Sequence, residues 1–118
     1  MQRKVPFIEG KYYHLYNRGV DKRSIFSSVS DYTRFMALLY LANNDEDVRI
    51  DNIFRSLTLE EILTQERGNQ LIALGAFCLM PNHYHLVVRQ KVDNGITEFM
   101  RKLGTGYTNY FNKKYQHV

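Results

Sequence analysis

Apolar and polar residues follow two different periods along this chain, and the periods predict alternating strands and helices. Residues 11–17, KYYHLYN, are rich in tyrosine and alternate in side-chain direction, which predicts a strand that stops at Arg18. Residues 32–42 carry apolar side chains at helical spacing, and Ser30 is the expected N-cap of this helix. Residues 43–45, Asn-Asn-Asp, are expected to end it.

The second half of the chain predicts a hairpin and then a long helix. Residues 70–80, QLIALGAFCLM, are almost continuously apolar, which is typical of a buried strand. A Pro-Asn turn leads to residues 83–90, HYHLVVRQ, so the two strands are expected to be antiparallel neighbours. Residues 96–115 predict a helix whose apolar face contains Ile96, Phe99, Met100, Leu103 and Tyr107.

An acidic stretch, residues 43–69, joins the two halves. Thr58 and Glu61 form a capping-box pattern, which predicts a short helix near residues 59–66. We interpret the stretch as an insertion or long connection that lies away from any phosphate-bearing partner, since its charge would repel phosphate.

The order strand, helix, connection, strand, strand, helix predicts an α+β sandwich of the ferredoxin-like or RRM-like kind, in which helices pack on one face of an antiparallel sheet. The 118 residues suffice for a single domain, 1–118. Such a sheet usually closes with a further strand, and no strand pattern follows residue 90. We therefore expect the fold to be incomplete at its C-terminus.

Composition narrows the class of protein. Hydrophobic residues make up 44% of the chain, which is enough for a core, and no apolar run is long enough to span a membrane. The single cysteine, Cys78, cannot form an internal disulfide, and the N-terminal segment lacks the apolar region of a signal peptide. We expect a cytoplasmic protein without a membrane segment.

The distribution of charge is uneven. The formal net charge is +4, but residues 1–34 and 89–118 are both basic, whereas residues 35–88 hold seven acidic side chains against three basic ones. If the fold brings the two ends together, they form one positive face suited to phosphates, which makes a nucleic acid a candidate partner. A basic protein that binds no nucleic acid is the equally open alternative.

His83 and His85 are the sharpest local feature. Residues i and i+2 of a strand point to the same face, so the two imidazoles project side by side while Tyr84 and Leu86 point to the other face. Two neutral imidazoles held in this way can chelate a divalent metal. Such a pair is more often two surface histidines, and a metal needs further ligands; His14 is a possible neighbour, and the terminal His117 a weaker one.

Several segments resemble one known family. MPNHYHLVV (80–88) resembles the metal motif of HUH single-tyrosine transposases, in which two histidines flank a bulky hydrophobic residue on a strand. YYHLYNRGVDKRSIF (12–26) is similar to the opening strand and its exit in the REP-associated branch. SDYTRFMALL (30–39) and FMRKLGTGYTNYFNKKY (99–115) resemble the first and second helices of that branch. The four segments occur in the same order as in the family.

The resemblance implies a transposase that binds single-stranded DNA, usually at hairpins, and cleaves and transfers it through a phosphotyrosine intermediate. It implies that His83 and His85 hold Mg²⁺ or Mn²⁺, with a third polar ligand unidentified. The basic residues at the exit of the first strand and on the last helix are candidates for nucleic-acid contacts: Arg18, Lys22, Arg23, Arg101, Lys102, Lys113 and Lys114.

In the family, the nucleophilic tyrosine lies on a later helix than the one that resembles residues 96–115. We therefore expect the chain to be truncated before the catalytic-tyrosine helix, and we assign no catalytic residue. Tyr107 continues an apolar face and is expected in the core, while Tyr110 and Tyr115 are expected to stack on bases or pack on the sheet. The family also implies a homodimer.

Two other functions remain open. A non-catalytic RRM-like module that binds single-stranded nucleic acid would use Tyr12, Tyr13 and Tyr16 for base stacking. A replication initiator or relaxase would share the HUH chemistry, but the Asn-Arg-Gly and Tyr-Phe-Asn segments resemble the transposase branch.

Overall fold

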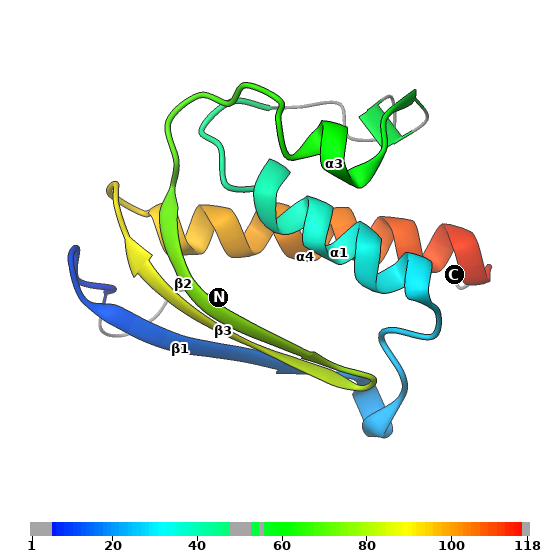
Figure 1. Cartoon of the computed structure of the whole chain (residues 1–118). Coiled ribbons are helices and arrows are strands. Elements are labelled where there is room, and N and C mark those ends of the chain that lie inside the picture. The colour runs from blue at the N-terminus through cyan, green and yellow to red at the C-terminus, as the bar shows by residue number, and fades with distance from the viewer. Residues whose placement is uncertain (1–5, 48–52, 55, 117–118) are drawn as a thin grey trace.

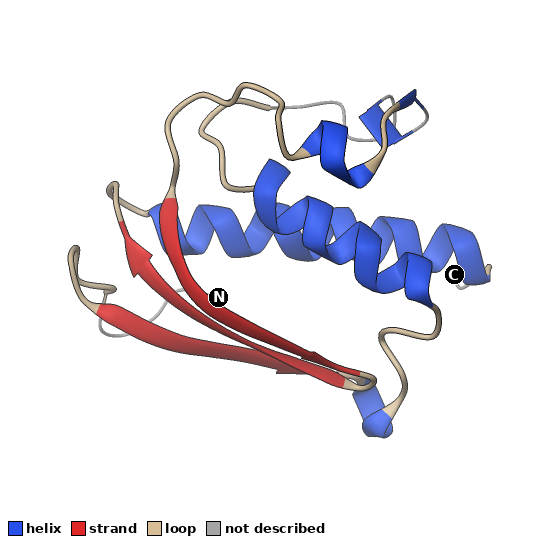
Figure 2. Cartoon of the chain, in the orientation of Figure 1, coloured by secondary structure: helices blue, strands red, loops and turns tan. Residues whose placement is uncertain are grey.

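A computed structural model describes residues 6–47, 53–54 and 56–116 and shows a sheet covered on one face by helices (Figures 1 and 2). Its strands are β1 (Tyr12–Arg18), β2 (Ile72–Met80) and β3 (His83–Gln90), arranged antiparallel in the order β1-β3-β2. The helices α1 (Val29–Leu41) and α4 (Gly95–Tyr115) lie on the same side of the sheet. The predicted α+β fold with helices on one face is confirmed.

Two short helices complete the described part of the chain. The 3-10 helix η1 (Val20–Lys22) follows β1 directly. Helix α3 (Leu59–Ile62) packs on α1, on the side away from the sheet. The capping box of Thr58 and Glu61 is present as predicted, but the helix ends at Ile62 rather than near residue 66.

The sheet has one covered face and one open face. Along β3, the side chains of Tyr84, Leu86 and Val88 are buried beneath the helices, while the residues between them are only partly covered. We call the surface that faces away from α1 and α4 the open face. The strict alternation on β3 therefore supplies one set of residues to the core and the other to the open face.

Strand β2 departs from the prediction of a buried strand. Its first residue, Ile72, is fully buried, but Gly75, Ala76, Phe77 and Cys78 are exposed. The reason is that β2 is an edge strand, with a bulge between Leu74 and Ala76, in a sheet that helices cover on one face only. A continuous apolar run does not distinguish this environment from a strand buried on both faces.

Helix α1 begins earlier than predicted. Its N-cap is Ser28, whose hydroxyl accepts a hydrogen bond from the backbone N–H of Asp31, so Ser30 is not the cap. Ser30 lies inside the first turn, because the Ser28 side chain is correctly spaced to satisfy the N–H three residues later.

The core lies between the helices and the covered face of the sheet. The apolar residues predicted for the two long helices form it together with β3, apart from Met100, which packs against it partly buried. Its buried members are Phe26, Phe35, Leu38, Leu39, Ala42, Leu71, Ile72, Tyr84, Leu86, Val88, Ile96, Phe99, Leu103 and Tyr107.

Asn43 ties the end of α1 to the start of β2. Its side-chain oxygen accepts hydrogen bonds from the backbone N–H groups of Leu71 and Ile72 at 2.8 and 2.9 Å, and its amide nitrogen donates to the Ile72 carbonyl at 2.9 Å. The side chain is 5% exposed. Residues 43–45 end the helix as predicted, and Asn43 in addition satisfies buried backbone groups of another element.

Candidate metal centre and DNA-binding face

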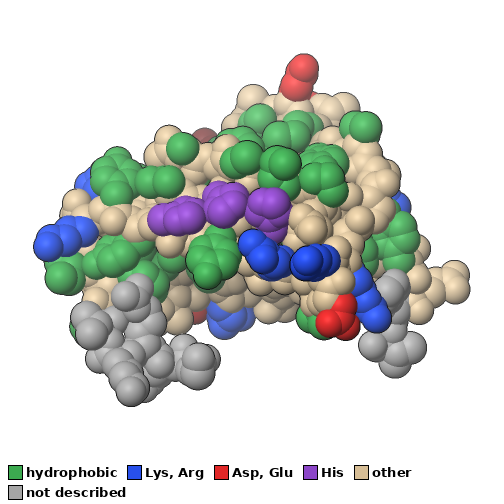
Figure 3. Space-filling model, turned by 90° about the horizontal axis from the view of Figure 1, so that it is seen from below, with side chains coloured by type: hydrophobic (Ala, Val, Ile, Leu, Met, Phe, Trp, Pro, Cys, Tyr) green, Lys and Arg blue, Asp and Glu red, His purple; other side chains and the backbone are tan. Residues whose placement is uncertain are grey.

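Three histidines form a row across the open face, which Figure 3 shows from below. His83 and His85 come from β3, and His14 comes from the neighbouring strand β1. The ring centroids of His14 and His85 are 4.9 Å apart, and those of His85 and His83 are 5.1 Å apart. The structure thus brings together the two predicted metal ligands and the candidate neighbour; His117 lies outside the described residues.

Each ring of the HUH pair is held through its Nδ1 atom. His83 Nδ1 lies 2.7 Å from Asn82 Oδ1, and His85 Nδ1 lies 2.8 Å from His14 Nε2. The Nε2 atoms of both rings make no hydrogen bond to the described residues. These two nitrogens are therefore the donor atoms that the open face offers to a ligand.

The electrostatic surroundings favour the neutral form of His85. Partial burial lowers the pKa of His85, and the nearby positive charges of His14, His83 and Arg18 lower it further. A neutral imidazole is the form that binds a metal.

The histidine pair fits part of the ligand set of a divalent metal. Within residues 6–47, 53–54 and 56–116, no group of three or more His, Cys, Asp or Glu side chains is placed to hold one ion. Two imidazole nitrogens from this chain leave the remaining positions for water, for a phosphate oxygen or for a polar group of another type.

Exposed aromatic rings flank the histidines on the open face. Tyr16 is 65% exposed, and its ring centroid lies 6.1 Å from that of His85. Tyr12 is 57% exposed, and the Arg89 guanidinium lies 5.9 Å from the centre of its ring. Sequence reasoning noted the tyrosines without placing them beside the metal pair; the signal was their even spacing with His14 on one strand.

The loop after β1 is fastened to the turn that precedes His83. Arg18 stands opposite His83 in the register of β1 and β3, and the N–H of Gly19 donates to the Asn82 carbonyl at 2.9 Å. A side-chain carbon at Gly19 would lie 2.1 Å from the Arg23 carbonyl oxygen, so only glycine allows this close approach. Arg18, Lys22 and Arg23 are exposed and belong to this end of the sheet.

A comparison with protein families agrees with these features. The model of the family described as "Transposase IS200 like" matches residues 8–118. The chain belongs to the IS200-like transposase family. The search of curated proteins and the search of solved structures gave no significant match. The family gives the protein a general role in DNA transposition and DNA as its partner. None of the described helices is long and apolar enough to cross a membrane.

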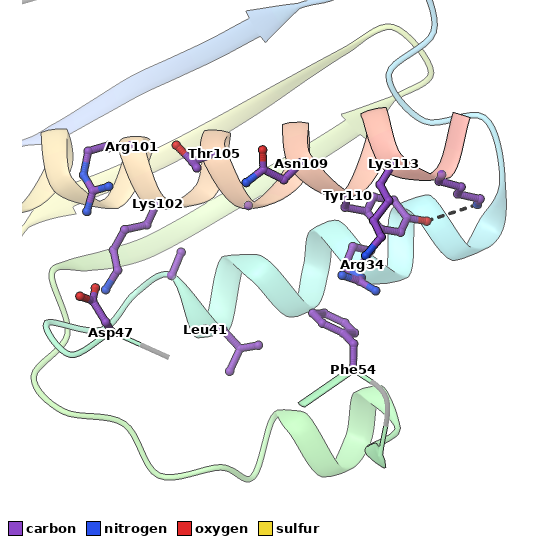
Figure 4. Close-up of a pocket in the computed structure, with 13 residues that line it drawn as sticks. Arg34, Leu41, Asp47, Phe54, Arg101, Lys102, Thr105, Asn109, Tyr110 and Lys113 are labelled. Carbon is purple, nitrogen blue, oxygen red and sulfur yellow. Dashed lines mark hydrogen bonds between the residues drawn. The ribbon is translucent and has the colours of Figure 1, made fainter. Parts of the chain in front are cut away.

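The transposase fold places the basic residues of α4 away from the histidine row. They line a cavity of about 540 Å³ between α1, α4 and the segment that contains Phe54 (Figure 4). Because α4 lies on the covered side of the sheet, the two basic ends of the chain do not form one face. The seven predicted DNA-contacting residues therefore form two sets.

Three of the four basic side chains on α4 have partners within the protein. Arg101 forms an ion pair with Glu98, and the ammonium group of Lys102 donates to the carbonyls of Asn44 and Glu46. Lys114 forms an ion pair with Asp31 at 2.8 Å. The Lys113 side chain makes no hydrogen bond or ion pair to the described residues.

The tyrosines of α4 belong to the helical layer of the transposase. Tyr107 is 8% exposed, its hydroxyl donates to the Ile25 carbonyl, and burial together with the nearby Asp31 charge raises its pKa. The hydroxyls of Tyr110 and Tyr115 both donate to the Asp31 carboxylate at 2.6 Å. None of the three lies on the open face, so none is placed to attack a phosphate at the histidine row.

Asp31 is the centre of this polar network. Burial opposes its charged form, but hydrogen bonds from Lys114, Tyr110, Tyr115 and the backbone N–H of Ser27 lower the pKa of Asp31 well below its usual range. The carboxylate is fully buried and remains charged because every partner donates to it. The network joins the C-terminal turns of α4 to the first turn of α1.

Proposed function

We propose that this IS200-like transposase binds single-stranded or hairpin DNA on the open face of its sheet, and that His83 and His85 hold Mg²⁺ or Mn²⁺ there for DNA cleavage and strand transfer through a phosphotyrosine intermediate. The observation that carries the proposal is the pair of Nε2 atoms on the open face, next to exposed aromatic rings and basic residues. The divalent metal, when bound, supplies a Lewis acid that polarises the scissile phosphate.

The residues around the histidine row have separate tasks in this proposal. Tyr16 and Tyr12 stack on bases of the single strand, since an aromatic ring stabilises any unpaired base through its face. Arg18, Lys22 and Arg23 contact phosphates on the side of His83, because the loop that carries them is fixed to the turn before that residue. This arrangement positions the backbone without reading its sequence.

The basic residues of α4 contact a different part of the DNA. Arg101, Lys102, Lys113 and Lys114 line a cavity on the helical side, too far around the molecule to share a phosphate with the metal. Lys113 is the best candidate for a direct contact, because the other three already have partners in the protein. We propose that the stem of a hairpin, rather than its cleaved strand, passes this side.

We propose that the protein acts as a homodimer in the cytoplasm, where its DNA substrate is found. Strand β1 is an edge of the sheet and has a free row of backbone groups, whereas the other edge strand, β2, carries a bulge. A regular edge is the better template for pairing with a second copy.

A non-catalytic RRM-like module is the second candidate. It is favoured by the exposed tyrosines of the open sheet and by the missing third ligand among the described residues. A specific metal site is what separates the two functions, because such a module uses none.

The first experiment measures Mn²⁺ binding by calorimetry and electron paramagnetic resonance in the wild type, in His83→Ala and in Arg89→Ala. Arg89 lies on the same strand and the same face as the histidines and serves as the matched control. We expect one specific site that is lost in His83→Ala and kept in Arg89→Ala. A wild type without a specific site would exclude the metal assignment and favour the RRM-like module.

The second experiment compares fluorescently labelled hairpin, single-stranded and duplex oligonucleotides of the same sequence. We expect the hairpin and the single strand to bind more tightly than the duplex, because only unpaired bases can stack on Tyr12 and Tyr16. Covalent capture with Mn²⁺ on a denaturing gel tests the cleavage step. Equal affinity for the duplex would contradict recognition through the open face.

A further inference from the structure

We propose that His14 is a positioning residue that selects the metal-binding nitrogen of His85: its Nε2 atom accepts the hydrogen bond of His85 Nδ1–H and so leaves the lone pair of His85 Nε2 facing the metal. The inference rests on the proposed function only for the metal itself. The hydrogen bond and the tautomer that it fixes are properties of the chain.

The contact between His14 and His85 has the geometry of a hydrogen bond. The two nitrogens are 2.8 Å apart, the ring planes are inclined by 17°, and the centroids are 4.9 Å apart. This centroid separation is close to the largest possible for two imidazoles whose nitrogens lie 2.8 Å apart. The rings therefore meet end to end and nearly in one plane, so that the axis of each nitrogen points at the other.

The same geometry argues against a metal between His14 and His85. Two imidazoles that share one ion direct their nitrogens at a common point about 2.1 Å from each, so the rings meet at an angle and their nitrogens lie farther apart. Nitrogens that point directly at one another leave no room for an ion. His14 is thus a partner of a ligand and not itself a ligand.

The contact requires one proton between the two nitrogens, and its location decides the chemistry. If His14 Nε2–H donated, His85 would carry its own proton on Nε2 and could not bind a metal there. If His85 Nδ1–H donates, His85 Nε2 is unprotonated and faces the open side. A metal-binding His85 therefore requires His14 to be the acceptor, with its own proton on Nδ1.

Asn82 does the same for His83. The Asn82 side-chain oxygen lies 2.7 Å from His83 Nδ1, and an amide oxygen can only accept, so His83 carries its proton on Nδ1. Both members of the HUH pair are thereby held in the same tautomer by a neighbour outside the pair. Outer partners of this kind orient ligating imidazoles in metal sites generally.

His14 is suitable for a clean test because it is exposed on the sheet surface and is not part of the hydrophobic core. His14→Ala removes the acceptor. His14→Gln is the conservative variant, because its amide oxygen reaches about as far as the imidazole Nε2 and can accept the same hydrogen bond. Circular dichroism confirms that both variants fold.

The measurement is a two-dimensional ¹⁵N–¹H spectrum of the imidazoles in the metal-free protein at about pH 8.5, where histidine is neutral. We expect His85 to carry its proton on Nδ1 in the wild type and in His14→Gln, and to shift to the Nε2–H form in His14→Ala. Mn²⁺ affinity is then expected to fall by about 10- to 100-fold in His14→Ala, with partial recovery in His14→Gln.

An unchanged tautomer in His14→Ala would overturn the proposal, and so would equal Mn²⁺ affinities for His14→Ala and His14→Gln. Failure of the proposed function gives a different result. In that case the wild type has no specific Mn²⁺ site, while the spectrum of the metal-free protein still shows whether His14 fixes the proton of His85.

Discussion

The two sides of this transposase hold polar groups in opposite ways. On the helical side, the charged and hydroxyl groups around Asp31 are donors and acceptors for one another, and the carboxylate is fully buried. On the open face, His83 and His85 each engage one ring nitrogen and leave the other exposed. Polar groups that satisfy each other stabilise the fold, whereas groups held in place but left partly unsatisfied are available to a ligand.

The comparison also explains which basic residues belong to which side. Lys114 and Lys102 lie on the helical side and donate to a carboxylate and to backbone carbonyls. Arg18 lies on the open face, opposite His83. A lysine with a structural partner loses stability when it is changed, while an exposed arginine next to a ligand site loses affinity.

The largest effect is expected when the open face loses its metal ligands. Replacement of both His83 and His85 by alanine should reduce specific Mn²⁺ affinity by at least about 100-fold, because the described residues contribute no other imidazole at that point. The free energy of unfolding should change by less than about 0.5 kcal/mol, since both side chains are outside the core. Calorimetry and urea denaturation measure the two quantities. A large loss of stability would show that the histidines are structural.

The opposite pattern is expected for Asp31→Ala on the helical side. Loss of the buried carboxylate leaves Lys114, Tyr110 and Tyr115 without their acceptor and should destabilise the protein by about 2–4 kcal/mol. Mn²⁺ affinity of the folded fraction should not change. Glu98→Ala is the matched control on the same layer, because its ion pair with Arg101 is exposed and should contribute less than about 1 kcal/mol.

Acid pH should remove the contribution of Asp31 selectively. Because the pKa of Asp31 is lower in the folded than in the unfolded state, its stabilisation is present above the unfolded value of about 3.9 and is lost as the pH falls below it. The difference in unfolding free energy between the wild type and Asp31→Asn should shrink by up to about 1.4 kcal/mol per pH unit in that range. Urea denaturation at pH 7, 4 and 3 measures it. A constant difference would contradict a charged Asp31.

The smallest effect separates the two sets of basic residues. The triple variant of Arg18, Lys22 and Arg23 to alanine should lower the slope of the logarithm of hairpin affinity against the logarithm of salt concentration by about 2, at about 0.7 for each phosphate contact. Lys113→Ala should lower it by no more than about 0.7. Fluorescence anisotropy at several salt concentrations measures both. A greater effect of Lys113 would move the main DNA contact to the helical side.

Local patterns predicted most of the fold because they report local physical causes. The helical spacing of Phe35, Leu38 and Leu39, and the alternation around Tyr84, identify faces that must be buried, and those residues are in the core. The errors occurred where more than one local solution exists. Ser28 and Ser30 can both cap a helix, and the apolar run of β2 fits a buried strand as well as an edge strand.

The sequence by itself determined that this transposase has an antiparallel hairpin with His83 and His85 on one face, since the period of a strand is fixed by backbone geometry. Only the tertiary structure decided that β1 lies beside β3, and with it that His14, Tyr16 and Arg18 join the histidines. It also decided that the basic residues of α4 lie on the other side. Strand pairing and the packing of helices on one face bring together residues up to 71 positions apart, and no short-range pattern contains that information.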